Sequence, residues 1–194
     1  MILGITGGTG SGKTTLLKLI QQAGGVILDC DAIYHQLLRD DHQLLQTIES
    51  RFPGTVVNGA LDRKKLGEQV FADKNALLEL NQITHSAVKK EVLRILEAKP
   101  SLAAIDAIGL FESGLNALCD VTVAVTAPEE LRIQRLMARD GISYEYARKR
   151  IDAQRDSQWY QERCAYTLEN DGQFDAFNAK CIAFLQDLDI MKAE

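Results

Sequence analysis

The sequence has no apolar run that approaches the roughly 18 residues of a membrane span. It also has no internal repeat, no low-complexity tract and no linker rich in Pro, Gly or Ser. The first apolar segment, Met1 to Ile5, runs directly into a group of glycines and leaves no room for a signal peptide. We therefore expect a cytoplasmic protein, and composition alone marks no domain boundary.

Cysteine is scarce, and no two cysteines lie close together in the sequence. The four cysteines, Cys30, Cys119, Cys164 and Cys181, lack the close spacing of a zinc site or a redox motif. We expect them to be buried free thiols, the usual state of isolated cysteines in a globular core.

Positive charge is in the minority. The chain has 22 Lys and Arg against 27 Asp and Glu, a formal net charge of −5, which argues against a surface for duplex nucleic acid. Hydrophobic residues make up 46% and charged residues 25%, ordinary values for a globular protein. The length of 194 residues is enough for one domain with a substantial core.

Short apolar segments, β-branched or apolar on both faces, predict buried strands. They are residues 2–5, 26–28, 102–108 and 121–125. After the first of these segments, apolar residues recur with helical spacing, at Leu16, Leu17, Leu19 and Ile20. Strands that alternate with helices predict an α/β fold of three layers, with a parallel sheet covered on both sides.

From Ala32 to Lys99 the apolar pattern is helical almost throughout. Asp73 is expected to cap one of these helices. Because the stretch is too long for a single crossover, we predict a helical subdomain over the C-terminal edge of the sheet. A further helix is predicted to open at Pro128 and to stop near Gly141.

The densest motif is GITGGTGSGKTT, residues 4–15. It contains the phosphate-binding pattern Gly7-x-x-x-x-Gly12-Lys13-Thr14, between a predicted strand and a predicted helix as the pattern requires. Glycines let backbone N–H groups approach phosphate oxygens, and the helix adds the positive end of its dipole. Lys13 is expected to reach the β- and γ-phosphates of ATP, and Thr14 to bind Mg²⁺. The residues predicted to bind the nucleotide are Gly8, Thr9, Gly10, Ser11, Gly12, Lys13, Thr14 and Thr15.

A phosphate-binding loop leaves two classes open, a GTPase-type switch and a small-molecule kinase. The switch needs a guanine-reading Asn/Thr-Lys-x-Asp, which the sequence lacks. Asp106-Ala-Ile-Gly109 imitates the Asp-x-x-Gly of such switches, but two fixed positions carry little weight. A kinase needs an acceptor site, a base and cations that close over the transferred group. The chain offers residues for each.

Two carboxylates, Asp29 and Asp31, follow the second predicted strand. Strand ends of open parallel sheets project into the crevice where phosphates bind. Because the two carboxylates are two residues apart on an extended segment, they would point the same way. One would accept the proton of an acceptor hydroxyl. The other would orient that hydroxyl or reach the metal. The structural alternatives are an N-cap for Asp31, on a helix beginning at Ala32, and a turn carboxylate for Asp29. The phosphate loop favours Asp31 as the base.

Arg132, Arg135 and Arg139 are spaced by three and four residues, hence on one face of a helix. Like charges at i,i+4 destabilise a helix by about 0.2–0.5 kcal/mol. Glu129 lies near enough to neutralise Arg132, whereas the other two lack an acidic residue four positions before them. We therefore predict that Arg135 and Arg139 bind an anion, since guanidinium groups match phosphate oxygens. The alternative is a solvated face.

Several segments of the chain match the pattern of one known family in their order and spacing. That family has Thr-Gly-Gly-Ile-Gly-Ser-Gly-Lys-Ser-Thr where this chain has Thr6 to Thr15, and Asp-Ala-Asp where it has Asp29-Cys30-Asp31. The other matching segments are Leu61-Asp62-Arg63 with Val70-Phe71, Leu80-Asn81 with His85, Leu110 to Leu115, Arg139-Asp140-Gly141, Arg150 to Gln154, and Asn170-Asp171-Gly172. Along almost its whole length the chain thus resembles the dephospho-CoA kinases.

The resemblance implies a P-loop kinase fold with a helical acceptor-binding subdomain and a short helical lid, in one domain of residues 1–194. The core would be about 1–31, 100–127 and 154–194, the acceptor-binding insertion about 32–99 and the lid about 128–153. It further implies ATP as donor, Mg²⁺, and dephospho-CoA as the acceptor, phosphorylated at its ribose 3′-hydroxyl to give CoA. We expect no nucleic-acid or membrane partner, and a monomer.

By position, the resemblance makes Asp31 the catalytic base, with Lys13 and Arg139 acting on the transferred phosphoryl group. The residues assigned to the acceptor are Asp29, Asp31, His85 and Glu112. Glu112 has the alternative of capping the following helix, and His85 that of a structural histidine in a loop.

The chain departs from the family pattern at three positions. His35 stands where many members have Arg, Ser86 replaces the Pro of His-Pro, and Gly109 replaces another Pro. Losing two prolines removes two fixed φ angles, so the acceptor pocket is expected to differ in shape.

Overall fold

The computed structural model describes residues 1–71 and 73–192. Its helices and strands are, in chain order, β1 (Ile2–Thr6), α1 (Lys13–Gln22), β2 (Val26–Asp29), α2 (Cys30–Asp40), α3 (His42–Arg51), β3 (Val56–Val57), β4 (Ala60–Leu61), α4 (Arg63–Val70), α5 (Lys74–Leu96), β5 (Ala103–Asp106), the 3₁₀-helix η1 (Leu115–Leu118), β6 (Val121–Thr126), α6 (Glu129–Asp140), α7 (Tyr144–Asp152), α8 (Ser157–Gln161), β7 (Tyr166–Glu169) and α9 (Phe174–Asp187). They form two compact units: a core unit within Met1–Leu28 and Pro100–Glu194, and a helical unit within Asp29–Lys99.

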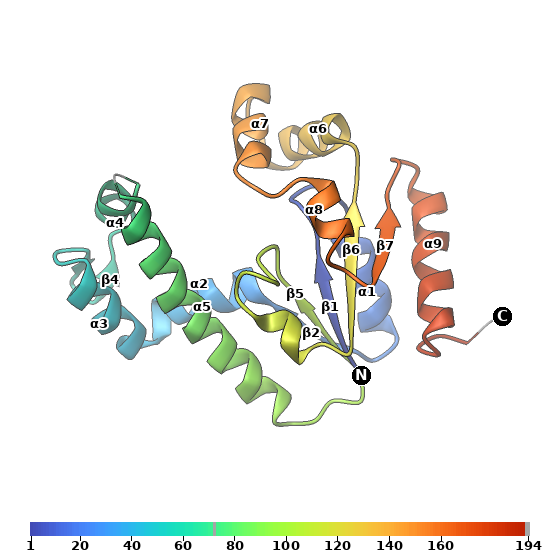
Figure 1. Cartoon of the computed structure of the whole chain (residues 1–194), viewed down its shortest axis with the longest axis horizontal. Helices are drawn as coiled ribbons and strands as arrows, with labels where there is room; N and C mark the ends of the chain where they lie inside the picture. The colour runs from blue at the N-terminus through green and yellow to red at the C-terminus, as the bar shows by residue number, and fades with distance from the viewer. Residues whose placement is uncertain (72, 193–194) are drawn as a thin grey trace. The chain divides into compact units, whose positions relative to one another are not determined.

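The core unit is built on a sheet with strand order β2-β5-β1-β6-β7 (Figure 1). β1 pairs in parallel with β5 on one side and β6 on the other, and β6 pairs in parallel with β7. The predicted parallel sheet is therefore confirmed. β2 is an edge strand whose Val26 is 41% exposed, so the prediction that the second strand is buried is wrong. β7 was not predicted, because its residues Tyr166–Glu169 are mostly exposed and show no apolar run.

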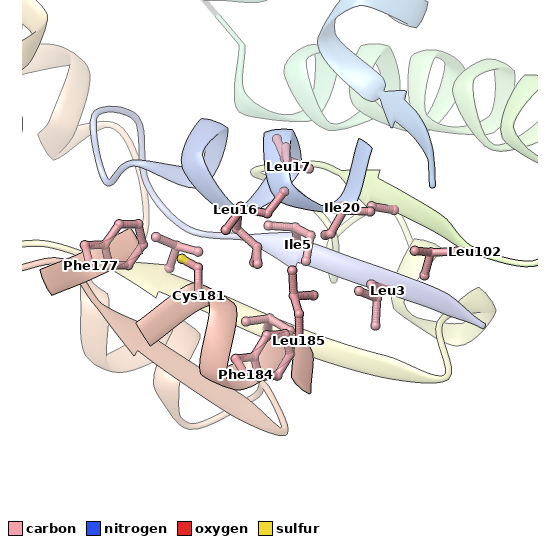
Figure 2. Close-up of a cluster of buried hydrophobic side chains, with 14 residues drawn as sticks. Leu3, Ile5, Leu16, Leu17, Ile20, Leu102, Phe177, Cys181, Phe184 and Leu185 are labelled. Atoms are coloured by element: carbon pink, nitrogen blue, oxygen red, sulfur yellow. The ribbon is translucent and has the colours of Figure 1, made fainter. Parts of the chain in front are cut away.

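Helices cover the sheet on both faces. On one face Leu3 and Ile5 of β1 pack with α1 and α9, and Figure 2 shows their side chains meeting Leu16, Leu185 and their neighbours. The other face carries Gly4, where an added Cβ would lie 2.9 Å from Leu110 Cδ2. η1 contacts β1 there, and α8 contacts β6. Because side chains alternate along each strand, apolar residues pack against helices on both faces of the sheet.

The helical unit is organised around α5, a helix of 23 residues that contacts α2, α3 and α4. Each of these helices begins at an aspartate whose side chain accepts a backbone N–H, which satisfies a donor that the first turn leaves open. The caps are Asp29 for α2, Asp41 for α3, Asp62 for α4 and Asp73 for α5. The predicted cap at Asp73 is confirmed.

The prediction of helix almost throughout Ala32–Lys99 overlooked a hairpin. β3 and β4 pair in antiparallel fashion, with Val57 opposite Ala60. The two residues between them, Asn58 and Gly59, have φ of 52° and 78°. Positive φ at both positions is the requirement of a type I′ turn, one of the common two-residue hairpin turns, and Asn-Gly is a pair that meets it easily.

α6 and α7 form a helix pair in the core unit. Pro128 precedes α6, and Gly141 ends it with φ of 64°, so both predicted boundaries are confirmed. Ile133 and Leu136 of α6 pack against Ala147 and Ile151 of α7.

All four cysteines are free, as predicted, but only Cys30 and Cys181 are buried, whereas Cys119 and Cys164 are half-buried. Burial raises the pKa of Cys119 to about 12 and that of Cys164 to about 11, so both stay protonated near neutral pH. Within residues 1–71 and 73–192, no helix is long and apolar enough to cross a membrane.

Candidate active site

The loop between β1 and α1 is a tight backbone turn that only glycine can form. Gly7, Gly10 and Gly12 have φ of 131°, 79° and 104°, a region that other residues rarely adopt. Space is equally restricted. A Cβ at Gly7 would collide with the carbonyl oxygen of Val125, and one at Gly8 with the guanidinium of Arg132. The spacing of the phosphate-binding pattern therefore follows from the geometry of this turn.

The loop's N–H groups divide into those that the protein uses and those that it leaves open. Thr9 N–H donates to Gln154 Oε1 at 2.8 Å, and Ser11 N–H donates to the Gly8 carbonyl at 3.2 Å. In the described part of the chain, the N–H groups of Gly8, Gly10 and Gly12 have no hydrogen-bond acceptor. Such a set of backbone donors at the start of a helix is suited to an anion.

Arg132 fixes the loop at Thr9. It is only 4% exposed, and its Nε donates to the Thr9 carbonyl at 2.9 Å. Its Nη2 donates at 3.1 Å to Gln154 Oε1, the atom that accepts from Thr9 N–H. Burial lowers the pKa of Arg132. The alternative of a solvated arginine face is wrong for this residue, since its guanidinium is an internal brace for the loop.

Arg135 and Asn170 hold the next part of the loop. Arg135 Nη1 donates to the carbonyls of Gly10 and Ser11 at 3.1 and 3.3 Å, and its Nη2 donates to Asn170 Oδ1 at 3.1 Å. The buried Asn170 donates in turn to the Ser11 carbonyl at 2.9 Å. With its carbonyls taken by α6 and by the residue that follows β7, the loop presents its remaining N–H groups outward.

We expect Arg132→Met to lower the free energy of unfolding by about 1–3 kcal/mol, because the Thr9 carbonyl would be left buried without a donor. ATP affinity should fall with it, since the loop would lose its shape. Denaturant unfolding and calorimetric titration with ATP measure the two effects. The control is Arg148→Met on α7, where the arginine is exposed and, among the described residues, pairs only with Asp152; it should change stability by less than about 0.5 kcal/mol. Equal losses in the two variants would contradict the bracing role.

Lys13 lies at the start of α1 with its amine directed at the loop. Nζ donates to the Gly7 carbonyl at 3.0 Å and lies 3.9 Å from Asp106 Oδ1. Asp106 is the last residue of β5, opposite Ile5 of β1. Thr14, the next residue of α1, is exposed, and Thr15 N–H donates to the Gly12 carbonyl at 3.0 Å. The structure thus brings Lys13 together with a carboxylate that sequence reasoning had dismissed as a weak switch-like match.

Arg139 lies one turn beyond Arg135 on α6 and forms a different set of contacts. Its Nε and Nη2 donate to the two carboxylate oxygens of Asp140 at 2.7 and 3.0 Å. Arg150 of α7 donates to the same carboxylate at 2.6 Å. The hydrogen bond from Arg139 is the main reason that the pKa of Asp140 falls to about 2. Arg139 thus has an acidic partner, but this partner is the adjacent Asp140 and not a residue four positions before it.

Glu112 follows β5 at the start of a turn-rich segment. η1 is capped by Gly114 without a side-chain hydrogen bond, so the capping alternative for Glu112 is wrong. Its Oε1 instead lies 3.5 Å from Arg155 Nε. Arg155 also lies over the ring of Trp159, with Cζ 5.2 Å from its centroid. Glu112 thus belongs to a charged and aromatic surface beside α8.

In the helical unit, the two aspartates after β2 differ in their surroundings. α2 begins at Cys30 rather than Ala32, and Asp29 is its cap, with Oδ1 accepting from Ala32 N–H at 2.9 Å. Asp31 lies in the first helical turn and is exposed. The prediction of two carboxylates on one extended segment is wrong, because the second already has helical neighbours. Capping is the role of Asp29, which leaves the Asp31 carboxylate available for chemistry.

His85 lies within α5 and is half-buried, so its interpretation as a loop histidine is wrong. Ser86, where the family has proline, carries the backbone N–H that an α-helix uses, and α5 continues through this position.

Four residues of the site were missed or underrated: Arg132, Gln154, Asn170 and Asp106. Gln154 and Asn170 stand in segments that carry the family resemblance, but nothing in their local pattern says that they hold the loop. The signal for Asp106 was available. P-loop enzymes hold their metal with an acidic residue at the end of an apolar strand, and that strand lies beside the strand that precedes the phosphate-binding loop.

Comparison with solved structures gives the class of protein. TT1252 from Thermus thermophilus matches with a TM-score of 0.81 and 33% identity, over 97% of each chain. Dephospho-CoA kinase from Campylobacter jejuni matches with a TM-score of 0.67 and 28% identity, over 96% of each chain. With its phosphate-binding loop between β1 and α1, the chain has the fold of a P-loop kinase.

The family follows from the sequence comparisons. The model of the dephospho-CoA kinase family matches residues 1–176. Dephospho-CoA kinase of Anaeromyxobacter dehalogenans is 36% identical, over 96% of this chain and 92% of its own length. The chain belongs to the dephospho-CoA kinase family, and the predicted fold class, enzyme class and family are confirmed.

Proposed function

We propose that the chain transfers the terminal phosphoryl group of ATP, with Mg²⁺, to the ribose 3′-hydroxyl of dephospho-CoA, giving CoA in the cytoplasm. The observation that carries this proposal is the braced loop. Gly8, Gly10 and Gly12 offer N–H groups without acceptors in the described residues, while Arg132 and Arg135 hold the loop carbonyls from behind. A donor set fixed before ATP arrives costs no reorganisation during phosphoryl transfer.

Lys13 and the two threonines of α1 are proposed to act on the phosphates. Lys13 would pair with the β- and γ-phosphates, and its contacts with the Gly7 carbonyl and Asp106, which hold Nζ at the loop, support this role. The N-terminus of α1 carries the partial positive charge that favours them.

Mg²⁺ fits the oxygen donors at the loop. A hydroxyl and a carboxylate, Thr14 and Asp106, are ligand types that Mg²⁺ prefers, and the ion commonly takes only one or two protein ligands beside the substrate phosphates. No group of three or more His, Cys, Asp or Glu that could hold a metal occurs in the described residues. We propose that Thr14 and Asp106 would hold the ion, which would supply positive charge against the negative charge of the transferred phosphoryl group.

Arg139 is proposed to meet ATP from the lid. Arg139 and Arg150 share one carboxylate, Asp140, so the group of three keeps a net positive charge. Arg139 is 59% exposed, so its guanidinium is accessible to a phosphate, and we propose that it exchanges Asp140 for one when ATP binds. Arg135 supports ATP binding through the loop.

Asp31 is proposed as the base that takes the proton of the 3′-hydroxyl. Its position in the first turn of α2 leaves the carboxylate exposed, whereas Asp29 is occupied as the cap. Asp29, His85 and Glu112 remain proposed acceptor contacts.

An acceptor screen tests the function. ATP consumption should show the highest kcat/KM with dephospho-CoA, against adenosine, shikimate, gluconate and nucleoside monophosphates. Adenosine should be poor in kcat as well as KM, because binding energy from the remote parts of dephospho-CoA is needed to position the ribose. A far higher kcat/KM with shikimate or a nucleoside monophosphate would leave only the general kinase assignment.

A further inference from the structure

Thr9 of the phosphate-binding loop is held on both sides by residues of the helix pair and its continuation. Its N–H donates to Gln154 Oε1 at 2.8 Å, and its carbonyl accepts from Arg132 Nε at 2.9 Å. The two partners are also joined to each other, because Arg132 Nη2 donates to the same Gln154 Oε1 at 3.1 Å. Thr9, Arg132 and Gln154 thus form a closed set of three hydrogen bonds, the Thr9 node.

The Thr9 node attaches the loop to both ends of the segment 128–153, which contains α6 and α7. Arg132 lies in the first turn of α6. Gln154 is the second residue after α7, and its N–H donates to the Ile151 carbonyl at 2.9 Å. α6 and α7 lie side by side (Figure 1), with the buried Ile133 of α6 packed in one cluster with Ile151 of α7. One residue of the loop is therefore bonded where this helix pair begins and where it ends.

The geometry of the peptide bond links the Thr9 node to the open donors of the loop. The Thr9 carbonyl and the Gly10 N–H belong to one peptide unit, which is planar and trans, so the two groups point in opposite directions. With the carbonyl bonded to Arg132 Nε, the Gly10 N–H is directed away from that guanidinium, and within the described residues it has no acceptor. The direction of this donor is thus set by a contact on the opposite side of its own peptide.

Gln154 serves the Thr9 node through its oxygen alone. Oε1 accepts both hydrogen bonds, whereas the described part of the chain offers no acceptor to the Nε2 group of this side chain. A glutamate has the same length and carries an oxygen in the same place, so it would keep both bonds. Leucine has no acceptor and would leave the Thr9 N–H and one Arg132 N–H without a partner.

The Thr9 node has room to shift. Arg132, Ile151 and Gln154 also line a cavity of about 430 Å³. Protein interiors are otherwise close-packed, so side chains that border a cavity move with less displacement of their neighbours than side chains within a filled core. A small movement of the loop can therefore be followed by the two ends of the helix pair.

We propose that Gln154 is a positioning residue of the phosphoryl transfer. Through Thr9 and Arg132 it directs the Gly10 N–H toward the phosphates of ATP, and it orders the segment 128–153 when those phosphates bind. The coupling is reciprocal: if an ordered helix pair strengthens ATP binding at the loop, bound ATP favours the ordered helix pair by the same factor. The inference rests on the proposed function, since it takes ATP as the ligand of the loop.

Steady-state kinetics test the positioning role. Gln154→Leu should lower kcat/KM for ATP by about 10-fold to 100-fold, the range for leaving a buried donor without an acceptor. Gln154→Asn, which is one methylene shorter and remains polar, should lower it in the same direction with less effect on the fold. Gln154→Glu should stay within about threefold of the wild type, because it supplies the same acceptor. The matched control is Gln158→Leu, an exposed glutamine of α8 that bonds only to Glu162 among the described residues, and it should stay within about twofold.

Protection of α7 by ATP separates positioning from packing. Arg148 and Lys149 of α7 are exposed, so the rate of trypsin cleavage there, with and without saturating ATP, measures the order of the segment. ATP should slow cleavage by about 5-fold or more in the wild type, Gln154→Glu and Gln158→Leu. It should slow cleavage by less than about twofold in Gln154→Leu and Gln154→Asn, at ATP concentrations where calorimetry shows their sites to be filled. Loss of packing alone would speed cleavage equally with and without ATP and leave the ratio unchanged.

The outcomes distinguish this inference from the proposed function. If the wild type binds ATP and phosphorylates dephospho-CoA, and Gln154→Leu and Gln154→Asn keep the wild-type protection ratio, the positioning role is wrong while the proposed function stands. The same conclusion follows if ATP does not protect the wild type, or if Gln154→Glu loses protection as fully as Gln154→Leu. A wild type that binds no ATP in the calorimeter would overturn the proposed function, and the coupling with it.

Discussion

Replacing Lys13 with alanine should lower kcat by about 10³-fold or more, one of the two largest losses expected from single substitutions in this chain. The amine lies at the braced loop, 3.0 Å from the Gly7 carbonyl, in a side chain that is only 13% exposed. Removing a fixed positive charge from a partly desolvated site takes away stabilisation that grows as charge develops on the phosphoryl oxygens. The effect should therefore fall mainly on kcat rather than on the affinity for ATP.

The measurement is a coupled assay of ADP release with dephospho-CoA, together with thermal unfolding of each variant. Lys18→Ala provides the control, because this lysine lies on the same helix and is exposed. The control should keep wild-type kcat and unfolding temperature. Turnover by Lys13→Ala at the rate of Lys18→Ala would remove the loop lysine from the mechanism, whatever the affinity for ATP.

The loop and its helix could be predicted from the sequence because local geometry determines them. Gly7 and Gly12 adopt φ values that only glycine tolerates, so the motif marks the backbone turn itself. The four apolar residues after Lys13 mark the buried face of α1 in the same local way. Signals of this kind are complete within about a dozen residues, and no distant contact is needed to interpret them.

The bracing of the loop could not be predicted, since it joins residues far apart in the chain. Arg132 and Thr9 are 123 positions apart, and Asn170 and Ser11 are 159 apart. Helical spacing placed Arg132 and Arg135 on one face but does not distinguish a face that meets solvent from one that meets the loop. That distinction depends on where β6 and β7 lie in the sheet, which periodicity does not give.

Other misses had a local signal that was available. Asn58-Gly59 between short apolar pairs is the commonest signature of a tight hairpin, yet it stood inside a long stretch with helical periodicity. After β2, the cap was expected at Asp31 of a helix beginning at Ala32, whereas Asp29, which lies nearer the strand, caps α2. There the expected helix was correct and its start was displaced by two residues.

Replacing Asp31 with asparagine should lower kcat by about 10²–10⁴-fold, the range for loss of a general base, with little change in ATP affinity. Asparagine keeps the shape of the side chain and removes its capacity to take a proton. In the structure Asp31 is exposed in the first turn of α2 and, within the described residues, has no hydrogen-bond or ion-pair partner. Loss of a carboxylate near the helix N-terminus costs only about 0.3–1 kcal/mol, so the fold should survive.

Asp29→Asn is the matched control for this prediction, since the two aspartates are two residues apart and differ in their contacts. Asn caps a helix about as well as Asp, so this variant should keep the hydrogen bond to Ala32 N–H and retain stability. Single-turnover rates for both variants, with dephospho-CoA and saturating ATP, compare the proton-transfer role directly. An inactive Asp29→Asn beside an active Asp31→Asn would reverse the assignment, making the capping residue the base, whereas loss in Asp31→Asn alone fits a carboxylate that the fold leaves available.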